Sequence, residues 1–380
     1  MYPLIIPEYH IIKIHGVPVD KGVISLKKER YFYVGTYAEE HEDGIYLCRL
    51  NLDTGELQHV AAVSGIKNPS FLALNKQQNR LYAVSETGKS ALLCYKVETY
   101  EEGKFGIGQQ ALTLSSRLTM DGQDPCHLTV SEMGQVYVVH YSSAHVNSYA
   151  VDEAGDLQEM ISQIQHTGGS GVVADRQGDA HAHQIRLDPT EKYAYVSDLG
   201  MDAIVQYELQ QGMLKEVARV HLPQGTGPRH LVFHPQLPLA YGINELNNTI
   251  TAYHYDVETG SLKIAQHVPT LKEASDAETI SADIHVSVDG KYVYGSNRGA
   301  DNLVQYRIDT ATGLLHQPTW TSVLGEWPRN FAIQGEHVLV ANQYSNEIVS
   351  FRRNVETGEL TSTGFKLAVK SPTCILFDSR

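Results

Sequence analysis

The sequence predicts an all-β protein, a seven-bladed β-propeller built from four-stranded blades. A short hydrophobic phrase ending in a polar residue occurs seven times, with 45 to 58 residues between successive copies. Short stretches of alternating apolar and polar residues precede and follow each copy, and most repeats end in a glycine-containing turn. Four short strands per unit, repeated without helical periodicity, are typical of a propeller, whose radial closure protects the edges of its sheets.

The repeated phrase places a tyrosine, a small residue and then a polar residue at the end of one strand in each blade. Its copies read FYVGTY, LYAVSE, VYVVHY, AYVSDL, AYGINE, VYGSNR and, with leucine in place of tyrosine, VLVANQ. Alignment of the copies gives one polar column: Thr36, Ser85, His140, Asp198, Asn244, Asn297 and Asn342. The number of copies predicts seven blades.

A second strand precedes each phrase, and in most blades a proline opens it. The copies read NPSFLAL, DPCHLTV, HAHQIRL, GPRHLVF, SADIHVS, WPRNFAI and, at the end of the chain, SPTCILF. A third strand follows the phrase, and most units then reach a turn such as DTGEL, EAGDL or ETGSL. Glycine supplies the positive φ of a short hairpin with a bulge. The triplet at residues 53–55 belongs to this series and is not an aspartic-protease motif.

The two ends of the repeated region complement each other. The first repeat lacks its innermost strand, whereas SPTCILF has the pattern of an innermost strand with nothing after it. We therefore expect the C-terminal strand to complete the first blade, with residues 29–380 forming a single propeller domain. Residues 1–28 do not fit the repeat and are assigned to an N-terminal extension.

Composition and charge exclude several classes of function. The 380 residues are 42% hydrophobic and carry a formal net charge of −14. Nucleic acids and anionic membranes require a clustered positive face, so neither is expected as a partner. The four cysteines lack CxxC spacing, and the chain shows neither a long apolar run nor a signal-peptide core. We therefore expect a cytoplasmic protein with reduced thiols.

Residues that break the repeat are candidates for chemistry, because one small ligand cannot use seven identical blades. The position after the opening proline holds Ser70, Cys126, His183, Arg229, Ala282, Arg329 and Thr373. The position after the polar column holds Tyr37, Glu86, Tyr141, Leu199, Glu245, Arg298 and Gln343. The exceptional members gather in blades four to seven. Guanidinium groups match carboxylate or phosphate, so this positive focus in an acidic protein predicts a site for a small anion.

Structural roles remain open for two of these arginines. Arg229 can form a salt bridge with Glu245, which is compatible with anion binding. Arg329 can be a solvated residue at the mouth of the channel, paired with Glu326 or Glu347. Neither pairing removes the concentration of positive charge.

The histidines allow several interpretations. His181 and His183 have the i, i+2 spacing that suits a zinc site on a strand, but no third ligand is apparent, so no metal is expected. His230 is expected on the opposite face of its strand from Arg229, where it packs, and His127 is interpreted as an ordinary polar position. The glycine-rich segment HTGGSGV, residues 166–172, is interpreted as a flexible loop.

Four segments, HAHQIRLDP, GPRHLVFHP, INELNNTI and ADIHVSVDGKYVYGSNR, resemble the propeller-type 6-phosphogluconolactonase family, lactonases similar to the fungal carboxymuconate cyclase. They occur in the family's order, and the resemblance covers about 350 residues. It implies a seven-bladed propeller. The family's functional positions fall on His181, Arg229, Glu245 and Arg298. Further candidates for substrate binding are Arg329, His183, Asn244, Asn297 and Asp283.

The resemblance implies hydrolysis of 6-phospho-D-glucono-1,5-lactone to 6-phosphogluconate in the pentose phosphate pathway, without a cofactor. Such hydrolysis needs a base for water and a stabilised oxyanion. We expect His181 to be the base, with Glu245 either orienting its imidazole or acting as the base itself. Arg229 and Arg298 are expected to bind the oxyanion or the phosphate, and Arg329 to extend the phosphate site.

Two alternatives stay open at this point. A cycloisomerase acting on a muconate-type dicarboxylate would use the same arginines to hold carboxylates. A non-enzymatic propeller would bind a peptide or protein at one mouth, and would expose aromatic or apolar side chains there instead of a cluster of cations, acids and histidine. Oligomeric state is not predicted.

Overall fold

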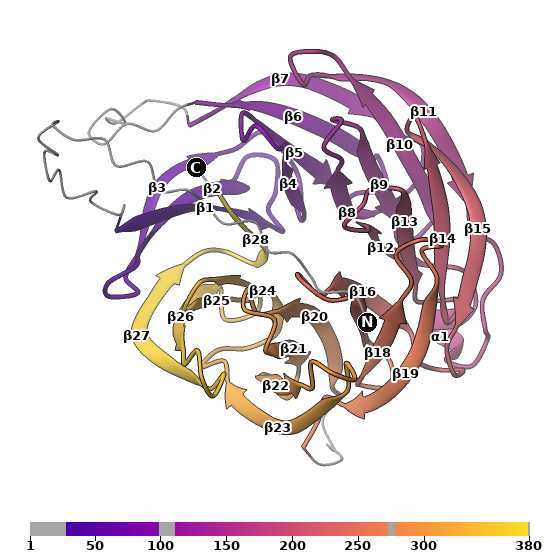
Figure 1. Cartoon of the computed structure of the whole chain (residues 1–380). Helices are drawn as coiled ribbons and strands as arrows, with labels where there is room; N and C mark the ends of the chain where they lie inside the picture. Colours follow the sequence, from indigo (N-terminus) through magenta and orange to yellow (C-terminus); the bar gives the residue numbers. More distant parts are fainter. Residues whose placement is uncertain (1–27, 99–110, 273–277, 379–380) are drawn as a thin grey trace, which may run out of the picture.

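The computed structural model describes residues 28–98, 111–272 and 278–378, which form seven four-stranded antiparallel sheets around a central axis (Figure 1). The prediction of a seven-bladed β-propeller is confirmed. Residues 1–27 of the predicted extension lie outside the described residues, so the boundary of the propeller domain stays a prediction. Within the described ranges, no helix is long and apolar enough to cross a membrane.

The strands follow the order predicted from the repeats. Blade 1 contains β28 (Pro372–Phe377), β1 (Glu29–Thr36), β2 (Ile45–Asn51) and β3 (Leu57–Val63). Blade 2 contains β4 (Leu72–Leu74), β5 (Arg80–Ser85), β6 (Ala91–Val97) and β7 (Leu112–Thr119). Blade 3 contains β8 (Pro125–Val130), β9 (Val136–His140), β10 (His145–Val151) and β11 (Leu157–Gln165). A short helix, α1 (Ala174–Gln177), precedes blade 4.

The remaining four blades repeat the same order. Blade 4 contains β12 (Ala182–Leu187), β13 (Tyr193–Asp198), β14 (Ala203–Gln210) and β15 (Met213–His221). Blade 5 contains β16 (Pro228–Phe233), β17 (Leu239–Asn244), β18 (Thr249–Tyr255) and β19 (Leu262–Pro269). Blade 6 contains β20 (Ile280–Val286), β21 (Tyr292–Arg298), β22 (Asn302–Ile308) and β23 (Leu315–Ser322). Blade 7 contains β24 (Pro328–Gln334), β25 (His337–Asn342), β26 (Glu347–Arg353) and β27 (Leu360–Ala368).

The C-terminal strand closes the ring, as the sequence predicts. Strand β28 pairs antiparallel with β1, with Phe377 opposite Phe32 and Cys374 opposite Gly35. It therefore supplies the innermost strand of blade 1, beside β24 of blade 7. The backbone N–H of Ile375 donates to Oδ1 of Asn330 in blade 7 at 2.7 Å. A hydrogen bond from the main chain of blade 1 to a side chain of blade 7 thus joins the first and last blades.

The repeated tyrosine and the repeated turn glycine meet between neighbouring blades. In four blades, the tyrosine hydroxyl donates to the carbonyl of the turn glycine in the next blade; the pairs are Tyr82 with Gly155, Tyr195 with Gly260, Tyr241 with Gly313 and Tyr294 with Gly358. These glycines adopt positive φ, and a Cβ at Gly260 would lie 2.5 Å from the ring of Tyr193. The tyrosine and the glycine that recur in the sequence therefore form one contact between neighbouring blades.

Apolar side chains fill the space between adjacent blades. Between blades 5 and 6, for example, Ile243 and Ile250 pack with Ile284 and Val293, and each of these side chains is at most 3% exposed. Burial of apolar surface is the main favourable contribution to folding, so each blade is stabilised chiefly by its neighbours. A ring of this kind holds its innermost strands in fixed positions around the axis.

Candidate functional site

The residue after the opening proline is an extra residue in the innermost strand of five blades. The pairing register with the next strand shifts at each of these positions: Cys126, His183, Arg229, Arg329 and Thr373. Such a β-bulge leaves one residue unpaired and re-aims its side chain. The column that stood out in the sequence is thus a ring of bulges near one end of the channel.

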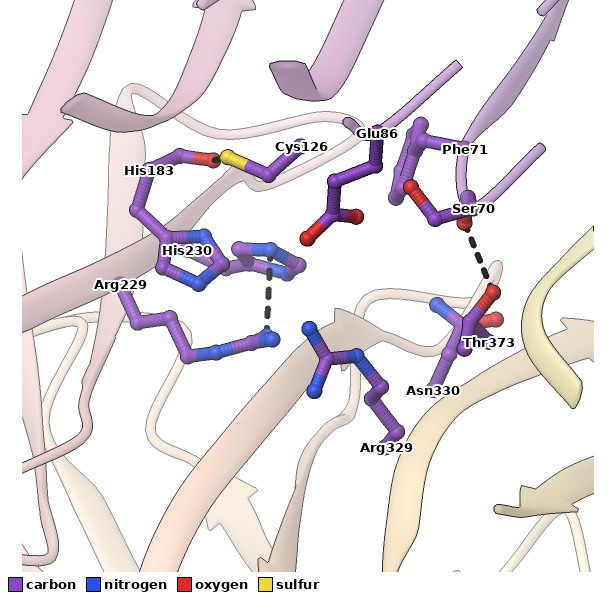
Figure 2. A pocket seen from close by; sticks show the side chains of 10 residues that line it. All are labelled: Ser70, Phe71, Glu86, Cys126, His183, Arg229, His230, Arg329, Asn330 and Thr373. Atoms are coloured by element: carbon purple, nitrogen blue, oxygen red, sulfur yellow. Dashed lines mark hydrogen bonds between the residues drawn. The ribbon is translucent and has the colours of Figure 1, made fainter. Parts of the chain in front are cut away.

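These bulges surround a cavity on the propeller axis (Figure 2). About 290 Å³ of space between these side chains is not filled by atoms, and this figure includes space open to solvent. The residues around it come from six blades: Ser70, Phe71, Glu86, Cys126, His183, Arg229, His230, Arg329, Asn330 and Thr373. All but one member of the sequence column line this cavity, the exception being Ala282.

Glu245 is the centre of the charge network at this end of the channel. Its Oε2 accepts from Nε of Arg229 at 2.9 Å and from Nη2 of Arg298 at 2.8 Å. Its Oε1 accepts from Nη2 of Arg176. The carboxylate is 2% exposed, so three guanidinium groups share one buried negative charge.

This environment decides the protonation of Glu245. Burial by itself would raise the pKa of the carboxyl group, but the positive charges of Arg298, Arg229 and Arg176 hold the pKa well below its usual range. A carboxylate this weakly basic is a poor proton acceptor. Its contacts make Glu245 the shared partner of the three arginines, and its role in catalysis stays a prediction.

Arg229 is held on three sides. Besides the bond to Glu245, its Nη1 donates to the carbonyl of Ala282 at 2.7 Å and to Nε2 of His230 at 3.2 Å. No hydrogen bond from Nη2 is found among the described residues, and the side chain lines the cavity. The protein thus fixes the guanidinium plane and leaves one edge available to a ligand.

The prediction for His230 is wrong. The bulge at Arg229 restarts the strand alternation, so His230 faces the channel beside Arg229 instead of packing behind it. Its Nδ1 donates to Oδ1 of Asp283 at 2.8 Å, which leaves Nε2 as the acceptor for Arg229. His127 is also more than an ordinary polar position, since its buried ring packs on Phe71 with 4.1 Å between centroids.

Asp283 is hydrogen-bonded to two residues that line the cavity, His230 and Asn330. Its Oδ1 binds His230, and its Oδ2 accepts from Nδ2 of Asn330 at 2.6 Å and Nε2 of His285 at 3.0 Å. It does not line the cavity. Both of its oxygens already have partners, and the expectation that Asp283 binds substrate stays a prediction.

His181 has one ring nitrogen fixed and the other unused. Its Nδ1 donates to the backbone carbonyl of Tyr141 at 2.9 Å, and its ring stacks on the Tyr141 ring with 4.5 Å between centroids. Its backbone N–H donates to Oδ1 of Asp198 at 2.8 Å. With the proton on Nδ1, Nε2 carries a lone pair, and no partner for Nε2 is found within the described part of the chain. Nε2 is thus placed to accept a proton, and the role of His181 as the base stays a prediction.

Arg176 is a site residue that the sequence did not reveal. It lies on α1, and its Nη2 also donates to the hydroxyl of Tyr141 at 3.1 Å, so it links His181's stacking partner to Glu245. The adjacent Gln177 donates to Oδ1 of Asp202 at 2.7 Å, which anchors the helix to blade 4. Because this segment lies outside the repeat, no column comparison reaches it.

Arg329 lies on the opposite side of the cavity from this network. Its Nη2 donates to the hydroxyl of Tyr37 at 2.7 Å, and the same hydroxyl donates to Oε1 of Glu86 at 2.8 Å. The guanidinium carbon lies 5.0 Å from the Tyr37 ring centroid. The expected pairing with a glutamate of its own blade is corrected: Arg329 reaches across to blades 1 and 2. Tyr37 and Glu86 stood in the columns but were not recognised as site residues.

His183 lines the cavity, whereas two asparagines of the polar column do not. Nδ2 of Asn244 donates to the hydroxyl oxygens of Thr249 and Thr251, and Nδ2 of Asn297 donates to the carbonyl of Thr270. Both asparagines are fully buried within their blades. These bonds give both asparagines a structural role within their blades, and their expected role in substrate binding stays a prediction.

No metal centre is formed by the residues that the structure describes, in which no group of three or more histidine, cysteine or acidic side chains is suitably arranged. His181 and His183 do not act as a pair. His181 contacts Tyr141 at the mouth, whereas the bulge turns His183 into the axial cavity.

Comparisons with known proteins identify relatives over nearly the whole chain. Residues 31–377 match the family described as lactonase, 7-bladed beta-propeller. A 6-phosphogluconolactonase of Bacillus subtilis is 32% identical, with 91% of this chain and 97% of the relative aligned. A 6-phosphogluconolactonase of Formosa agariphila is 34% identical, with 90% of this chain and 98% of the relative aligned.

Solved structures give the same result. A crystal structure from Bacteroides fragilis superimposes with a TM-score of 0.85 at 30% identity, covering 93% of this chain and 99% of the other. The periplasmic gluconolactonase of Pseudomonas aeruginosa superimposes with a TM-score of 0.82 at 27% identity, covering 92% and 99%. The chain belongs to the lactonase family of seven-bladed β-propellers.

Proposed function

We propose that the protein hydrolyses a phosphorylated sugar lactone, 6-phospho-D-glucono-1,5-lactone, to 6-phosphogluconate at this end of the channel. The observation that carries the proposal is the buried Glu245 carboxylate shared by three guanidinium groups, beside an imidazole with a free lone pair. Relatives named 6-phosphogluconolactonase that align over 90% or more of the chain support the choice of substrate. A role in the pentose phosphate pathway and a cytoplasmic location are part of the same proposal.

His181 activates water. Its Nε2 accepts a proton as the water oxygen bonds to the lactone carbonyl carbon, which produces a tetrahedral intermediate with a negatively charged oxygen. The Nδ1 bond to the Tyr141 carbonyl and the stack on the Tyr141 ring hold the imidazole in one tautomer and one orientation. When the ring C–O bond breaks, the imidazolium returns its proton to the departing ring oxygen, so the base is regenerated and the product is the open-chain acid.

The arginines divide the negative charge of the substrate between them. Arg229 and Arg298 are almost fully buried and fixed by Glu245, which suits them to stabilise the oxyanion. The side chain of Arg176 is 32% exposed, which suits it to bind the bulkier phosphate, whereas the half-buried Arg329 lines a cavity too small for that group. Preorganised donors of this kind require no reorganisation when charge develops in the transition state.

A binding-only role fits the site less well. The described end of the channel presents four arginines, two glutamates and oriented histidines, whereas a peptide-binding mouth would be dominated by apolar and aromatic surface. The arginines do not by themselves distinguish a phosphorylated lactone from a dicarboxylate. A muconate-type cycloisomerase is therefore kept as an outcome of the test.

The test measures both reactions on one purified preparation. We expect hydrolysis of the phosphorylated lactone above the spontaneous rate, no lactonisation of muconate, and a loss of about 10²–10³-fold in kcat/KM for Arg229→Gln. The control, Arg307→Gln, removes an exposed arginine of blade 6 and keeps full activity. Muconate turnover by the wild-type protein, or full lactonase activity in Arg229→Gln, contradicts the proposal.

A further inference from the structure

The axial cavity is a small polar compartment. The centre of a sphere the size of a water molecule can move within only about 10 Å³ of it. The compartment therefore has room for about one particle of that size. Its wall is formed by the bulge residues, so side chains from opposite sides of the ring converge on one point of the axis (Figure 2). A phosphate or sulfate group is too large for this space as the side chains stand.

Two like charges face this compartment. Figure 2 shows the guanidinium groups of Arg229 and Arg329 ending beside the same space, although they come from blades 5 and 7. Burial lowers the pKa of Arg229, and the nearby charge of Arg329 lowers it further. Two cations this close, in surroundings of low dielectric, are unfavourable unless an anion lies between them.

The acids around the compartment do not cancel its charge. Four arginines (176, 229, 298 and 329) are accompanied by two glutamates, Glu245 and Glu86, which leaves two positive charges. Asp283 does not line the compartment, and Arg186 partly offsets its charge. A buried excess of positive charge is costly without a counter-ion.

Neutral donors complete the compartment. Ser70 is 3% exposed, and its Oγ has no hydrogen-bond partner within the described residues. Nδ1 of the buried His183 is likewise without a partner in the described part of the chain. Burial, followed by the charge of Arg229, holds the pKa of His183 well below its usual range, so its imidazole adds no charge. Hydroxyl and guanidinium donors together suit a halide.

We propose that the axial cavity is a binding site for a single monoatomic anion, chloride or bromide, held between Arg229 and Arg329 with the Ser70 hydroxyl as a third donor. Glu86 also lines the cavity, and its Oε1 accepts from the Tyr37 hydroxyl, which directs part of its charge away from the anion. The size of the compartment selects a monoatomic ion over phosphate or sulfate.

This site rests on the same arginines as the proposed function. The halide lies beside the free edge of the Arg229 guanidinium group. One oxygen of an anionic substrate would bind at the same edge. We therefore expect chloride to raise KM for the phosphorylated lactone with little effect on kcat. Halide binding itself is measured without catalysis, so failure of the lactonase assay and failure of halide binding remain distinguishable.

The experiment compares the full-length protein in chloride and in methanesulfonate at equal ionic strength. We expect a saturable rise in Tm of about 2 °C with chloride. Crystals soaked in bromide should show an anomalous peak on the axis between Arg229 and Arg329. Arg329→Gln should lose both the rise and the peak, and the matched control Arg307→Gln, which removes an exposed arginine, should keep both.

If Arg329→Gln does not fold, Ser70→Ala provides the second variant, and the chloride concentration at half-effect should rise several-fold. Equal Tm values in the two salts, together with no bromide peak in the cavity, would show that the compartment takes water only and would overturn the proposal. A bromide peak that persists unchanged in Arg329→Gln would also overturn it.

Discussion

Arg229 and Glu245 come from the same blade, and Nε of Arg229 donates to Oε2 of Glu245 at 2.9 Å with both side chains 3% exposed. Arg229 is the bulge residue of the innermost strand, and Glu245 follows the end of the next strand. The pair is therefore local in the fold, and it is this pair that Arg176 and Arg298 join from outside the blade.

Replacement of the shared carboxylate should affect both stability and activity. Glu245→Gln leaves the buried guanidinium groups of Arg229 and Arg298, and the partly exposed one of Arg176, without their counter-charge, so we expect a loss of about 3 kcal/mol in the free energy of unfolding. The value of kcat/KM for the lactone should fall by about 10²-fold or more, because Arg229 and Arg298 lose their alignment. Urea unfolding and initial rates measure the two effects. The control Glu258→Gln replaces an exposed glutamate and should change neither stability nor kcat/KM. Unchanged stability in Glu245→Gln would contradict the charge network.

The proposed base should be separable from the fold. His181 is only partly buried, so His181→Gln should change stability by less than about 1 kcal/mol while kcat falls by about 10²–10⁴-fold. The matched variant His267→Gln, at an exposed position of blade 5, should retain wild-type kcat. A kcat for His181→Gln within a factor of two of wild type would assign the proton transfer to another group.

Stability should fall in mild acid because of His230. Burial, then the charge of Arg229, lowers the pKa of His230 to about 4, whereas an unfolded histidine titrates near 6.5. The unfolded chain therefore binds more protons between these values, so the stabilisation is complete above pH 6.5 and is lost as the pH falls towards 4. For this group alone, we expect a loss of about 2 kcal/mol between pH 7 and pH 5.

Comparison of variants isolates that contribution, since His127 and His183 act in the same direction. Urea unfolding of His230→Gln at both pH values should show a loss smaller than that of the wild type by about 2 kcal/mol. The exposed His316→Gln should follow the wild type. Parallel profiles for wild type and His230→Gln would mean that the histidine is not buried in its neutral form.

Gly227 should be irreplaceable for steric reasons. Gly227 stands two residues before Arg229 and adopts a φ of +60°. A Cβ at this position would lie 2.4 Å from Cγ of Leu246. We expect Gly227→Ala to cost about 2–3 kcal/mol of stability and to lower kcat/KM, because the turn that sets the bulge must move. Gly65 adopts a φ of +89° with no atom within 4 Å of a built Cβ, so Gly65→Ala should cost only about 1 kcal/mol. Equal losses in thermal unfolding would show that the contact with Leu246 is unimportant.

The fold was predictable because the repeat is visible at two independent positions. The tyrosine of the phrase and the glycine of the turn recur together since one donates a hydrogen bond to the carbonyl of the other across blades, as in Tyr82 and Gly155. The closure by β28 was predictable for a related reason. The sequence showed an unpaired innermost strand at the C-terminal end of the chain and a first repeat that lacked its innermost strand, and the structure pairs the two.

The candidate site was only partly predictable. Breaks in the repeat pointed to Arg229, Arg298, Arg329 and Glu245, all of which the structure brings to one end of the channel. Arg176 escaped because a single sequence cannot show where an irregular insertion folds back. The orientation of side chains after each bulge also escaped, because simple alternation along a strand does not include the extra residue.

The asparagines of the polar column have a structural role that the column comparison did not bring out. Asn244 and Asn297 occupy the polar column that repeats in every blade, and such repetition indicates a structural role. Their hydrogen bonds within blades 5 and 6 have this character. Asp283 does not belong to the polar column. Its hydrogen bond to His230 of the neighbouring blade could not be predicted from the sequence.

The most direct test of the central claim is the ratio of kcat/KM values for 6-phospho-D-glucono-1,5-lactone and unphosphorylated D-glucono-1,5-lactone, each corrected for spontaneous hydrolysis. If Arg176, which Glu245 holds in place, recognises the phosphate, the wild-type protein should favour the phosphorylated lactone by about 10²-fold. Arg176→Gln should reduce that preference about 10-fold, and Arg307→Gln should leave it unchanged. Equal kcat/KM values for the two lactones in the wild-type protein would contradict the account.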